Sequence, residues 1–478
     1  MKTSVEATGG GGLHQAMTPT RLRWVMLLVT GAMFMEILDG SIIVTALPSI
    51  ARSFGEAPMA LELGVSAYML AVGVFIPASG WVADRFGARA ILAAAIVLFT
   101  LASLLCGSAQ GVHSFVALRI LQGVAGAMMV PVGRLVVMHH TPRDKLMEAM
   151  ASLVWPALIA PVLGPPLGGL ITTHLGWQWI FWLNLPIGVL ALVACLALVP
   201  DDKGEEARPF DWPGFALCGA ATFALLLGFD RMTVQPDIAG AGLIVLGLGL
   251  GVATLGHFRR AASPMLGLEP WSIQTFRASQ RGGALMRMSI GAVPFLLPLM
   301  FQIGFGYDAF HSGLLVLAVF AGNLGIKTVT TPILRRFGMR NVLIVNGVLS
   351  ALLIGACSLL QPHTAVPVAV ALLAAGGCAR SMQFTSINSM TFADVPRPQM
   401  SHANGLSNTL SQLTMAAGIT LGALGVRVGH GLAQHLGWQA PGAEYRFAFL
   451  LVALVTLMGV VDMLRLPRGA ADDFVKRS

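Results

Sequence analysis

Long apolar segments follow one another along almost the whole chain, separated by short polar breaks. A helix of about 20 mostly apolar residues crosses the hydrocarbon of a bilayer, where every backbone hydrogen bond must be made internally. Only 11% of the residues are charged, against about a quarter in soluble domains. The pattern therefore predicts an all-α polytopic membrane protein with fourteen transmembrane helices. The expected spans are 23–50, 62–83, 89–110, 114–138, 147–172, 177–199, 212–230, 238–258, 281–305, 309–331, 341–361, 365–392, 400–427 and 445–466.

Basic residues are unevenly divided between the two sides of these spans. If the N-terminus is cytoplasmic, the inner breaks and the two tails contain 21 of the 30 Lys and Arg residues. The external breaks contain Arg52, Arg231, Arg427 and Arg446, and the spans contain Arg119, Arg134, Arg287, Lys327 and Arg380. The positive-inside rule therefore predicts that both termini are cytoplasmic. Because the charge is spread over many breaks, we expect no nucleic-acid-binding patch.

Two inner breaks contain the same motif at the same offset. "GWVADRFGARAIL" covers 80–92 and "TPILRRFGMRNVL" covers 331–343, and both contain RFG-x-R. Internal duplication is common in transporters, with the substrate site between the repeats. We therefore expect two six-helix halves with two additional helices between them and a tail at each end. The expected boundaries are 1–22 for the first tail, 23–200 and 263–468 for the halves, 201–262 for the additional pair, and 469–478 for the last tail.

The first of these breaks is interpreted as a gate. Gly87 permits a tight turn, and Arg85 and Arg89 suit the anionic inner surface of the membrane. Asp84 lies at an inner helix end, where the helix dipole disfavours a carboxylate, so it needs an arginine or a helix N-terminus as partner. Such a contact could hold the halves together in one state and release them in another. The alternative is that both loops only set the topology, since the second copy has Arg335 in place of Asp84.

Two acidic residues lie inside the first span. Glu36 and Asp39 are three residues apart and share one helix face, and a carboxylate at the centre of a bilayer costs about 2.5–3.5 kcal/mol. We therefore expect Asp39 to bind and release a proton as its exposure to water changes. For Glu36, proton coupling and neutralisation of a nearby arginine are equally weighted. The expected partner is Arg119 in the fourth span, and a movement that joins or separates it from Asp39 would couple proton binding to transport.

Polar side chains in other spans indicate a water-filled cavity. The expected lining residues are Gln122, Arg380, Gln383, Asn404 and Asn408. For Arg380, pairing with an acid is the alternative to contact with substrate. Arg287 and Lys327 lie within two turns of the inner surface, so we expect their side chains to extend to it.

These segments resemble the major facilitator superfamily. Gly80, Asp84, Arg85, Gly87 and Arg89 match its loop signature G-x-x-x-D-[RK]-x-G-x-[RK]. Four further segments resemble, in order, motifs of its fourteen-span drug/proton antiporter branch, the EmrB/QacA type. They are "LDGSIIVTALP" (38–48), "RILQGVAGAMMVP" (119–131), "LGPPLGG" (163–169) and "WQWIFWLNLP" (177–186). Ser41, Val44 and Gln178 depart from the Thr, Asn and Arg usual in that branch.

The resemblance implies two bundles that rock around a central cavity and export small amphipathic compounds in exchange for protons, across the inner membrane of a bacterial cell. It assigns Gly164, Pro165, Gly168 and Gly169 to the antiporter motif of the fifth span. Some relatives recruit an adaptor protein in the periplasm, so such a partner is left open.

One fold serves many solutes, so a transporter selective for a specific metabolite, for export or uptake, is the alternative. A membrane enzyme or sensor is disfavoured, because the sequence has no Walker loop, no H-E-x-x-H and no large soluble loop. The five cysteines all fall within spans without CxxC spacing. We therefore expect no disulfide framework, metal site or cofactor.

Overall fold

The computed structural model describes residues 17–467 and Ala471, except for 57, 143–144, 147–148, 151–152, 154, 202–208, 235, 308, 436 and 438–440. Within this part of the chain all regular structure is helical, as expected. The helices of the first half of the chain are α1 (Pro19–Phe54), α2 (Pro58–Phe75), α3 (Ser79–Phe86), α4 (Ala88–Cys106), α5 (Val112–His140), α7 (Trp155–His174), α8 (Trp179–Trp182), α9 (Asn184–Leu198) and α10 (Trp212–Val234). Those that follow are α11 (Ile238–Arg260), α12 (Gln274–Leu299), α13 (Ala309–Gly325), α14 (Lys327–Phe337), α15 (Met339–Cys357), α16 (Val366–Ala393), α17 (Met400–His435) and α18 (Ala443–Leu464).

The number of spans differs from the expected fourteen. Among the described residues, 12 helices are long and apolar enough to cross a membrane, or up to 13 if the bent pair α13 and α14 counts as one span. That pair meets at 50° after Gly325, so the expected span 309–331 is broken. The expected span 147–172 overlaps α7, and part of this segment lies outside the described residues. The count of fourteen is therefore not confirmed.

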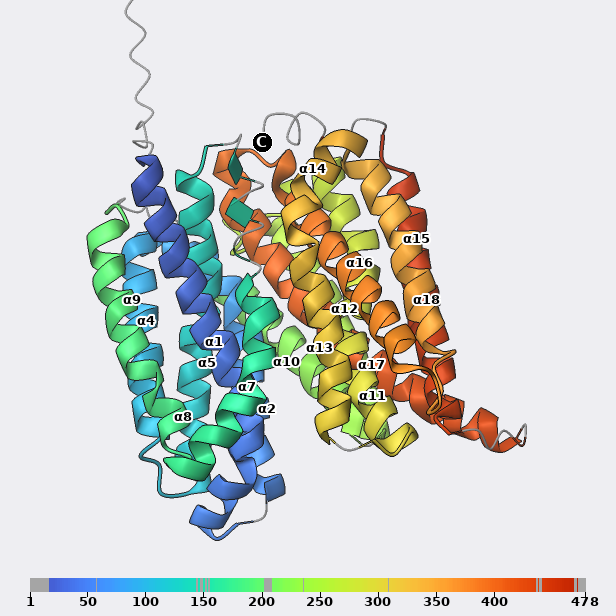
Figure 1. Cartoon of the computed structure of the whole chain (residues 1–478). Coiled ribbons are helices and arrows are strands. Elements are labelled where there is room, and N and C mark those ends of the chain that lie inside the picture. Colours follow the sequence, from blue (N-terminus) through green and yellow to red (C-terminus); the bar gives the residue numbers. More distant parts are fainter. Residues whose placement is uncertain are drawn as a thin grey trace, which may run out of the picture.

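The long helices form two groups that lie side by side (Figure 1). In the first group, α1 packs on α7 and α9, α2 packs on α5, and α4 packs on both α5 and α9. In the second, α12 packs on α17 and α18, α16 packs on α13 and α15, and α15 packs on α18. Helix α10 contacts both α2 and α17, and α11 packs on α10. Helix α10 therefore lies at the junction of the two groups.

The sequence repeat corresponds to a structural repeat. Gly87 joins α3 to α4 with φ +86°, and Gly338 joins α14 to α15 with φ +77°, a region that residues other than glycine rarely adopt. After each glycine an arginine reaches the end of a distant helix. Arg89 donates to the carbonyl of Leu196 in α9, and the corresponding Arg340 donates to that of Leu464 in α18. Each copy of the motif thus joins two helices that are distant in the sequence, α4 to α9 and α15 to α18.

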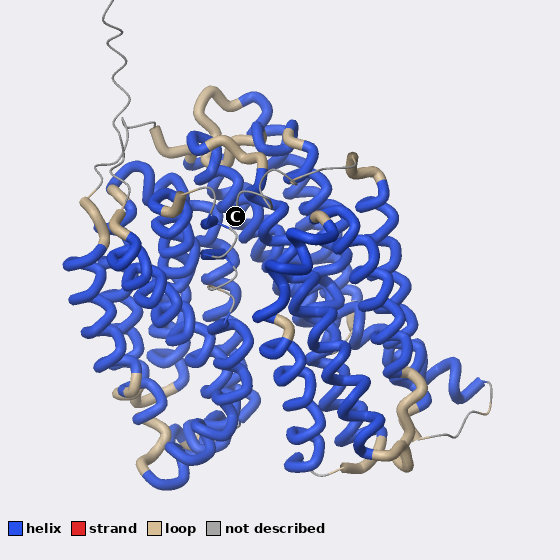
Figure 2. Tube along the Cα trace, turned by 45° about the horizontal axis from the view of Figure 1, so that its top comes forward, coloured by secondary structure: helices blue, strands red, loops and turns tan. Residues whose placement is uncertain are grey.

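The two groups touch at the face that contains the start of α1 and the end of α18, here called the terminal face. Toward the opposite face they diverge (Figure 2). Near the terminal face, Asn404 Nδ2 in α17 donates to the carbonyl of Pro131 in α5 at 3.0 Å, and Arg134 Nη1 donates to Asn408 Oδ1 at 2.8 Å. On the diverging side, a pocket of about 470 Å³ lies between α2, α10 and α17. The structure is therefore closed at the terminal face.

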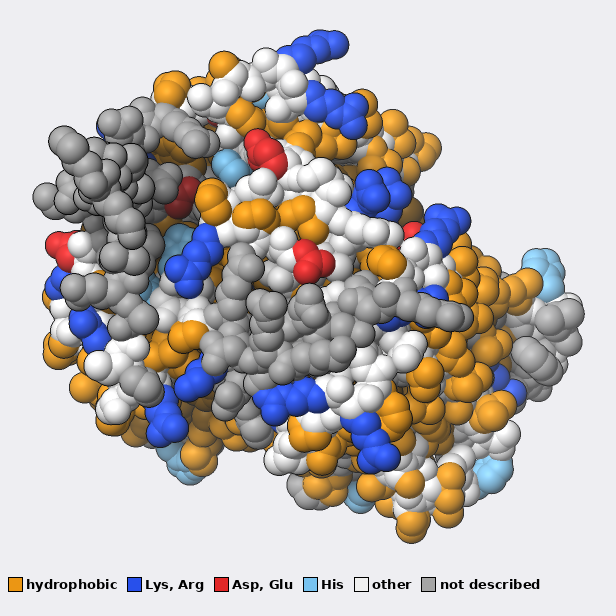
Figure 3. All heavy atoms as spheres, turned by 90° about the horizontal axis from the view of Figure 1, so that it is seen from above, with side chains coloured by type: hydrophobic (Ala, Val, Ile, Leu, Met, Phe, Trp, Pro, Cys, Tyr) orange, Lys and Arg blue, Asp and Glu red, His pale blue; other side chains and the backbone are white. Residues whose placement is uncertain are grey.

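Seen from above, the described residues of the terminal face include many Lys and Arg side chains and few Asp and Glu (Figure 3).

Asp211 ties the pair α10 and α11 to the second group. It lies just before α10, where its Oδ1 accepts from the backbone N–H of Gly214 at 2.9 Å, and its Oδ2 accepts from that of Met265 at 3.2 Å. His257 Nε2 lies 2.7 Å from the same carboxylate. Burial alone raises the pKa of Asp211, but the hydrogen bonds from His257, Gly214 and Met265 outweigh it and leave the pKa below its ordinary value.

Candidate functional site

Asp39 lies at the centre of a buried network made by α1, α5 and α9. Its side chain is 1% exposed and that of Arg119 is 0% exposed. Arg119 Nη1 donates to Asp39 Oδ2 at 2.6 Å, while Gln122 Nε2 and Asn184 Nδ2 donate to Oδ1 at 2.9 and 3.0 Å. The structure thus brings Asp39, Arg119 and Gln122 together. Three donors from two other helices hold the carboxylate in place.

Small residues allow the helices around this network to approach closely. A Cβ added to Gly123 in α5 would lie 2.6 Å from the carbonyl oxygen of Tyr68 in α2. One added to Gly64 in α2 would lie 2.7 Å from the Phe115 ring of α5. As a result the Arg119 guanidinium carbon lies 4.3 Å from the centre of the Tyr68 ring, a cation–π contact. Arg119 is therefore held between an anion and an aromatic face.

Sequence reasoning missed two members of this network. Asn184 lies in "WQWIFWLNLP", the segment singled out only for its resemblance, and it links Asp39 to Ser103 by a 2.8 Å hydrogen bond. Tyr68 is one of three tyrosines in the chain, in a span that otherwise offered no polar stripe. For both Asn184 and Tyr68, a polar side chain within an apolar span was the sequence signal that could have indicated a place in the network.

Glu36 lies one turn from Asp39 but makes different contacts. Among the described residues no ion pair joins Glu36 to a cation, and its Oε2 has no hydrogen-bond partner. A Cβ added to Gly126 would lie 3.1 Å from Glu36 Oε1 and 3.3 Å from the Tyr68 hydroxyl. The carboxylate therefore points toward α5 and α2. It pairs with no arginine of the described residues, so the structure does not support neutralisation, one of the two roles expected for Glu36.

The residues of the expected gate lie at the terminal face. A Cβ on Gly80 would lie 2.6 Å from Ser401 Oγ, so α3 and α17 touch across the two groups at this glycine. Asp84 is half-buried on α3, and the exposed Arg85 lies over the Phe86 ring at 6.0 Å. Gly87 and Arg89 make the turn and the helix-end contact described above. The loop therefore lies where the two groups meet.

The antiporter motif contacts α1 directly after Asp39. A Cβ on Gly164 in α7 would lie 2.2 Å from Ser41 Oγ, which itself donates to the carbonyl of Ala160 at 3.2 Å. Gly168 is buried, whereas a Cβ on Gly169 would meet nothing within 4 Å. The Pro165 side chain lies outside the described residues. Close helix packing in this motif thus centres on Gly164.

The five residues expected to line one cavity lie in three separate places. Gln122 belongs to the Asp39 network, and Asn404 and Asn408 lie in the contact between the groups. Gln383 Oε1 accepts from Asn346 within the second group at 2.7 Å. Arg380 lines a small cavity of about 30 Å³ there, and its Nη2 lies 2.8 Å from the Asn323 amide oxygen when that amide is oriented to satisfy both neighbours. The sequence could not predict these three places. Polar residues recur at the same helical spacing whether they face a cavity, a neighbouring helix or the opposite half.

Two cations expected to extend to the inner surface do not do so. Arg287 is 1% exposed and its Nη1 donates to the carbonyl of Ser279. Lys327 Nζ donates to the buried Thr385 Oγ1 in α16 at 2.6 Å. The expectation of snorkelling is therefore wrong for both, because each side chain finds polar atoms inside the protein closer than the surface.

The helical fold and the buried charge network define a polytopic membrane protein of a transporter class. The sequence profile of the Major Facilitator Superfamily matches residues 29–419, so the chain belongs to this superfamily. Relatives named "Putative multidrug resistance protein MdtD" come from Pectobacterium atrosepticum, 36% identical over 447 residues, and from Enterobacter sp. strain 638, 36% identical over 464. These alignments cover 92% and 96% of this chain and 95% and 97% of the relatives. They confirm the resemblance to the drug/proton antiporter branch.

Two solved structures share the fold. The proton:xylose symporter XylE aligns with a TM-score of 0.62 at 12% identity, covering 96% of this chain and 99% of that one. The human organic anion transporter MFSD10 aligns with a TM-score of 0.61 at 15% identity, covering 94% and 100%. At these identities the likeness concerns the fold alone.

Proposed function

We propose that the chain is a proton-coupled antiporter that exports small amphipathic compounds by alternating access. It lies in the bacterial inner membrane with both termini in the cytoplasm, and the terminal face is the cytoplasmic one. The two groups of helices act as the two six-helix halves, and α10 and α11 are the additional pair. The MdtD relatives and the Lys- and Arg-rich terminal face support this assignment.

The single observation that carries the proposal is the buried pair of Asp39 and Arg119. In the structure Asp39 Oδ2 lies 2.6 Å from Arg119 Nη1, so the two side chains form an ion pair. A proton bound to Asp39 leaves Arg119 without its counter-charge inside the protein, which is unfavourable. The proton is therefore bound together with a rearrangement of α1 against α5, and Ser41 transmits that rearrangement to Gly164 in α7. Such a linkage makes proton entry and the change of access one event.

Proteoliposome transport tests the proposal. The purified protein is reconstituted, an outward proton gradient is imposed by an acidic lumen, and uptake and proton flux are followed for cationic, neutral and anionic compounds. We expect substrate movement against proton flow, lost in Asp39→Asn and kept in Asp201→Asn, which replaces an exposed acid outside the helices. Proton-driven transport retained by folded Asp39→Asn contradicts the role of Asp39. Transport of one metabolite alone favours a selective transporter.

A further inference from the structure

Two arginines near the contact between the groups pair with no carboxylate of the described residues. Arg134 in α5 and Arg287 in α12 approach the same stretch of α17, since Gln280, a partner of Arg287, donates to Ser407 Oγ at 3.4 Å, next to Asn408. Arg134 Nη1 donates to Asn408 Oδ1 at 2.8 Å, and Arg287 Nη1 donates to Gln280 Oε1 at 3.3 Å. Among the described residues, no ion pair joins either guanidinium to an Asp or Glu. Arg287 is thus buried and Arg134 half-buried in one region where no described carboxylate compensates their charge.

Arg287 retains unused hydrogen-bonding capacity in this region. The residue is 1% exposed, yet its Nε and Nη2 have no partner among the described residues. A buried cation with unmet donors is unfavourable unless another group satisfies it. A guanidinium presents its N–H groups as a planar fork that matches the oxygens of a carboxylate, sulfonate or phosphate. Nε and Nη2 of Arg119 are unmet as well, but Arg119 has Asp39 as its counter-charge, whereas Arg287 has no described carboxylate, so its unmet donors suit an anion.

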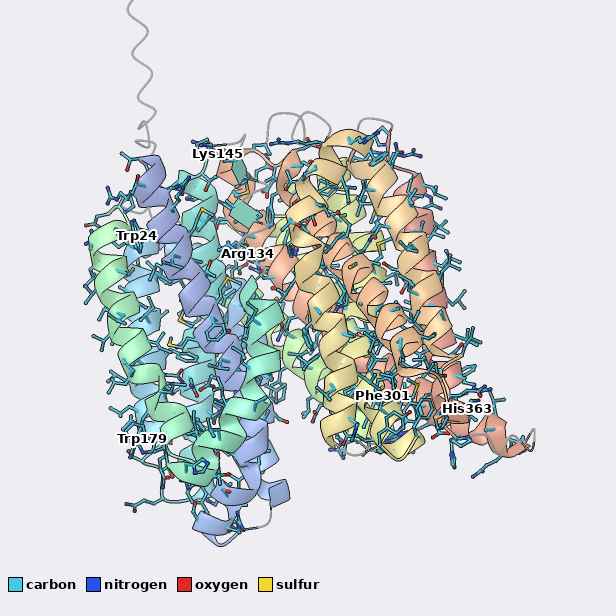
Figure 4. The ribbon with its side chains drawn as sticks, in the orientation of Figure 1. Trp24, Arg134, Lys145, Trp179, Phe301 and His363 are labelled. Atoms are coloured by element: carbon cyan, nitrogen blue, oxygen red, sulfur yellow. The ribbon has the colours of Figure 1, made fainter. Side chains whose placement is uncertain are left out.

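The position of the pair suits cargo binding from the cytoplasmic side. Arg134 lies six residues before the end of α5 at His140, which is about 9 Å at 1.5 Å per residue. Figure 4 shows it between the two groups of helices, below the terminal face. Gln280, Ser407, Asn404 and Asn408 surround the region with uncharged polar groups. When the halves separate at the terminal face, Arg134 loses Asn408 and its guanidinium becomes available.

We propose that Arg134 and Arg287 bind the anionic group of the transported molecule, so that the cargo is an amphipathic organic anion rather than a cation. This inference rests on the proposed export function and specifies its substrate class. Cargo enters when the terminal face opens, and its anionic group replaces Asn408 on Arg134 and fills the unmet donors of Arg287. Closure at that face restores the bond to Asn408 and displaces the cargo toward the diverging side.

Equilibrium binding with a matched pair of dyes tests this inference. Fluorescein is anionic, whereas rhodamine 123, whose carboxyl group is a methyl ester, is cationic on the same three-ring body. Their fluorescence anisotropy is titrated with the full chain in phosphatidylcholine nanodiscs. We expect fluorescein to bind at least ten-fold more tightly than rhodamine 123. Arg287→Gln should weaken fluorescein binding at least ten-fold and leave rhodamine 123 within two-fold, and Arg287→Lys should keep the preference for the anion.

The control is Arg465→Gln at the end of α18, where the side chain is 77% exposed. It should bind both dyes as the unmodified chain does. If Arg287→Gln does not fold, Arg134→Gln gives the same comparison at the other guanidinium. Equal affinity for both dyes, or fluorescein binding unchanged in both Gln variants, overturns the inference. Displacement of fluorescein by phosphatidylglycerol, lost in Arg287→Gln, assigns the site to a lipid headgroup and also overturns it.

Failure of this inference differs from failure of the proposed function. Arg287-dependent fluorescein binding without accompanying proton flux in proteoliposomes contradicts proton coupling but supports the anion site. Proton-driven export of rhodamine 123, unaffected by Arg287→Gln, supports proton coupling and contradicts the anion site.

Discussion

The pair of Asp39 and Arg119 should behave as one energetic unit. With an effective dielectric constant of about 20, two unit charges at the observed 2.6 Å attract by about 6 kcal/mol. Much of this is offset by the loss of hydration when both groups are buried. Removing one partner leaves the other charge buried alone, and such changes cost about 3–5 kcal/mol. We therefore expect Asp39→Asn and Arg119→Gln each to destabilise the protein by about 3 kcal/mol.

The double variant distinguishes a coupled pair from two independent residues. Asp39→Asn combined with Arg119→Gln leaves no buried charge at this position and retains polar side chains that can bond to each other. It should lose less stability than the sum of the single variants, with a coupling of about 2 kcal/mol. The assay is thermal unfolding of purified protein in one detergent at one pH, with Asp201→Asn as the control. Additive losses would refute the argument that the two charges depend on each other.

Three further predictions concern the packing at Gly164, the contact between the two groups at Asn408, and the cap of α10 at Asp211. Gly164→Val should cost about 1–3 kcal/mol of stability and slow transport, because its side chain would overlap Ser41. Gly169→Val, where space is open, should change neither stability nor transport rate. Equal transport rates of Gly164→Val and Gly169→Val would contradict the role of close packing at Gly164. Asn408→Leu removes one hydrogen bond across the groups, worth about 1 kcal/mol. Spin-label distances across the terminal face should then show about a five-fold larger open population, and an unchanged distribution would exclude a gating role. Asp211→Ala should lower the melting temperature at neutral pH by removing a helix cap of about 1 kcal/mol. Since the pKa of Asp211 is lowered in the fold, its contribution is fully present above the ordinary value near 3.8 and is lost as the pH falls through the lowered one. Melting temperatures that respond identically to pH in both proteins would contradict this role.

The bilayer made much of the fold predictable from the sequence. A lipid-exposed backbone has few alternatives to a helix, so apolar length alone located most of the spanning helices, although the count of fourteen is not confirmed. The RFG-x-R repeat located the two loops that contain Gly87 and Gly338. Both loops need a glycine with positive φ and an arginine that reaches a helix end, so the same residues occur in both. The bend between α13 and α14 was not predictable in this way, since the apolar segment continues through it.

Side-chain contacts were predictable where chemistry left few choices, and they were not predictable where the direction of a side chain decided them. A buried Asp39 needed a cation, and Arg119 was the cation at similar depth in the same half. Arg287 was placed by depth alone, and its side chain turned into the protein instead of toward the surface. The same helical spacing was compatible with both directions, so only the packed neighbours decided between them.

The most direct test of the account is the protonation of Asp39 itself during the cycle. Infrared difference spectra of the reconstituted protein, recorded between high and low pH, report the carbonyl band of a newly protonated carboxyl group. We predict a band that is absent from Asp39→Asn, is kept in Asp201→Asn, and shifts when substrate is added. If the Asp39 carboxylate stays ionised over the pH range in which a proton gradient drives transport, proton coupling through Asp39 is contradicted.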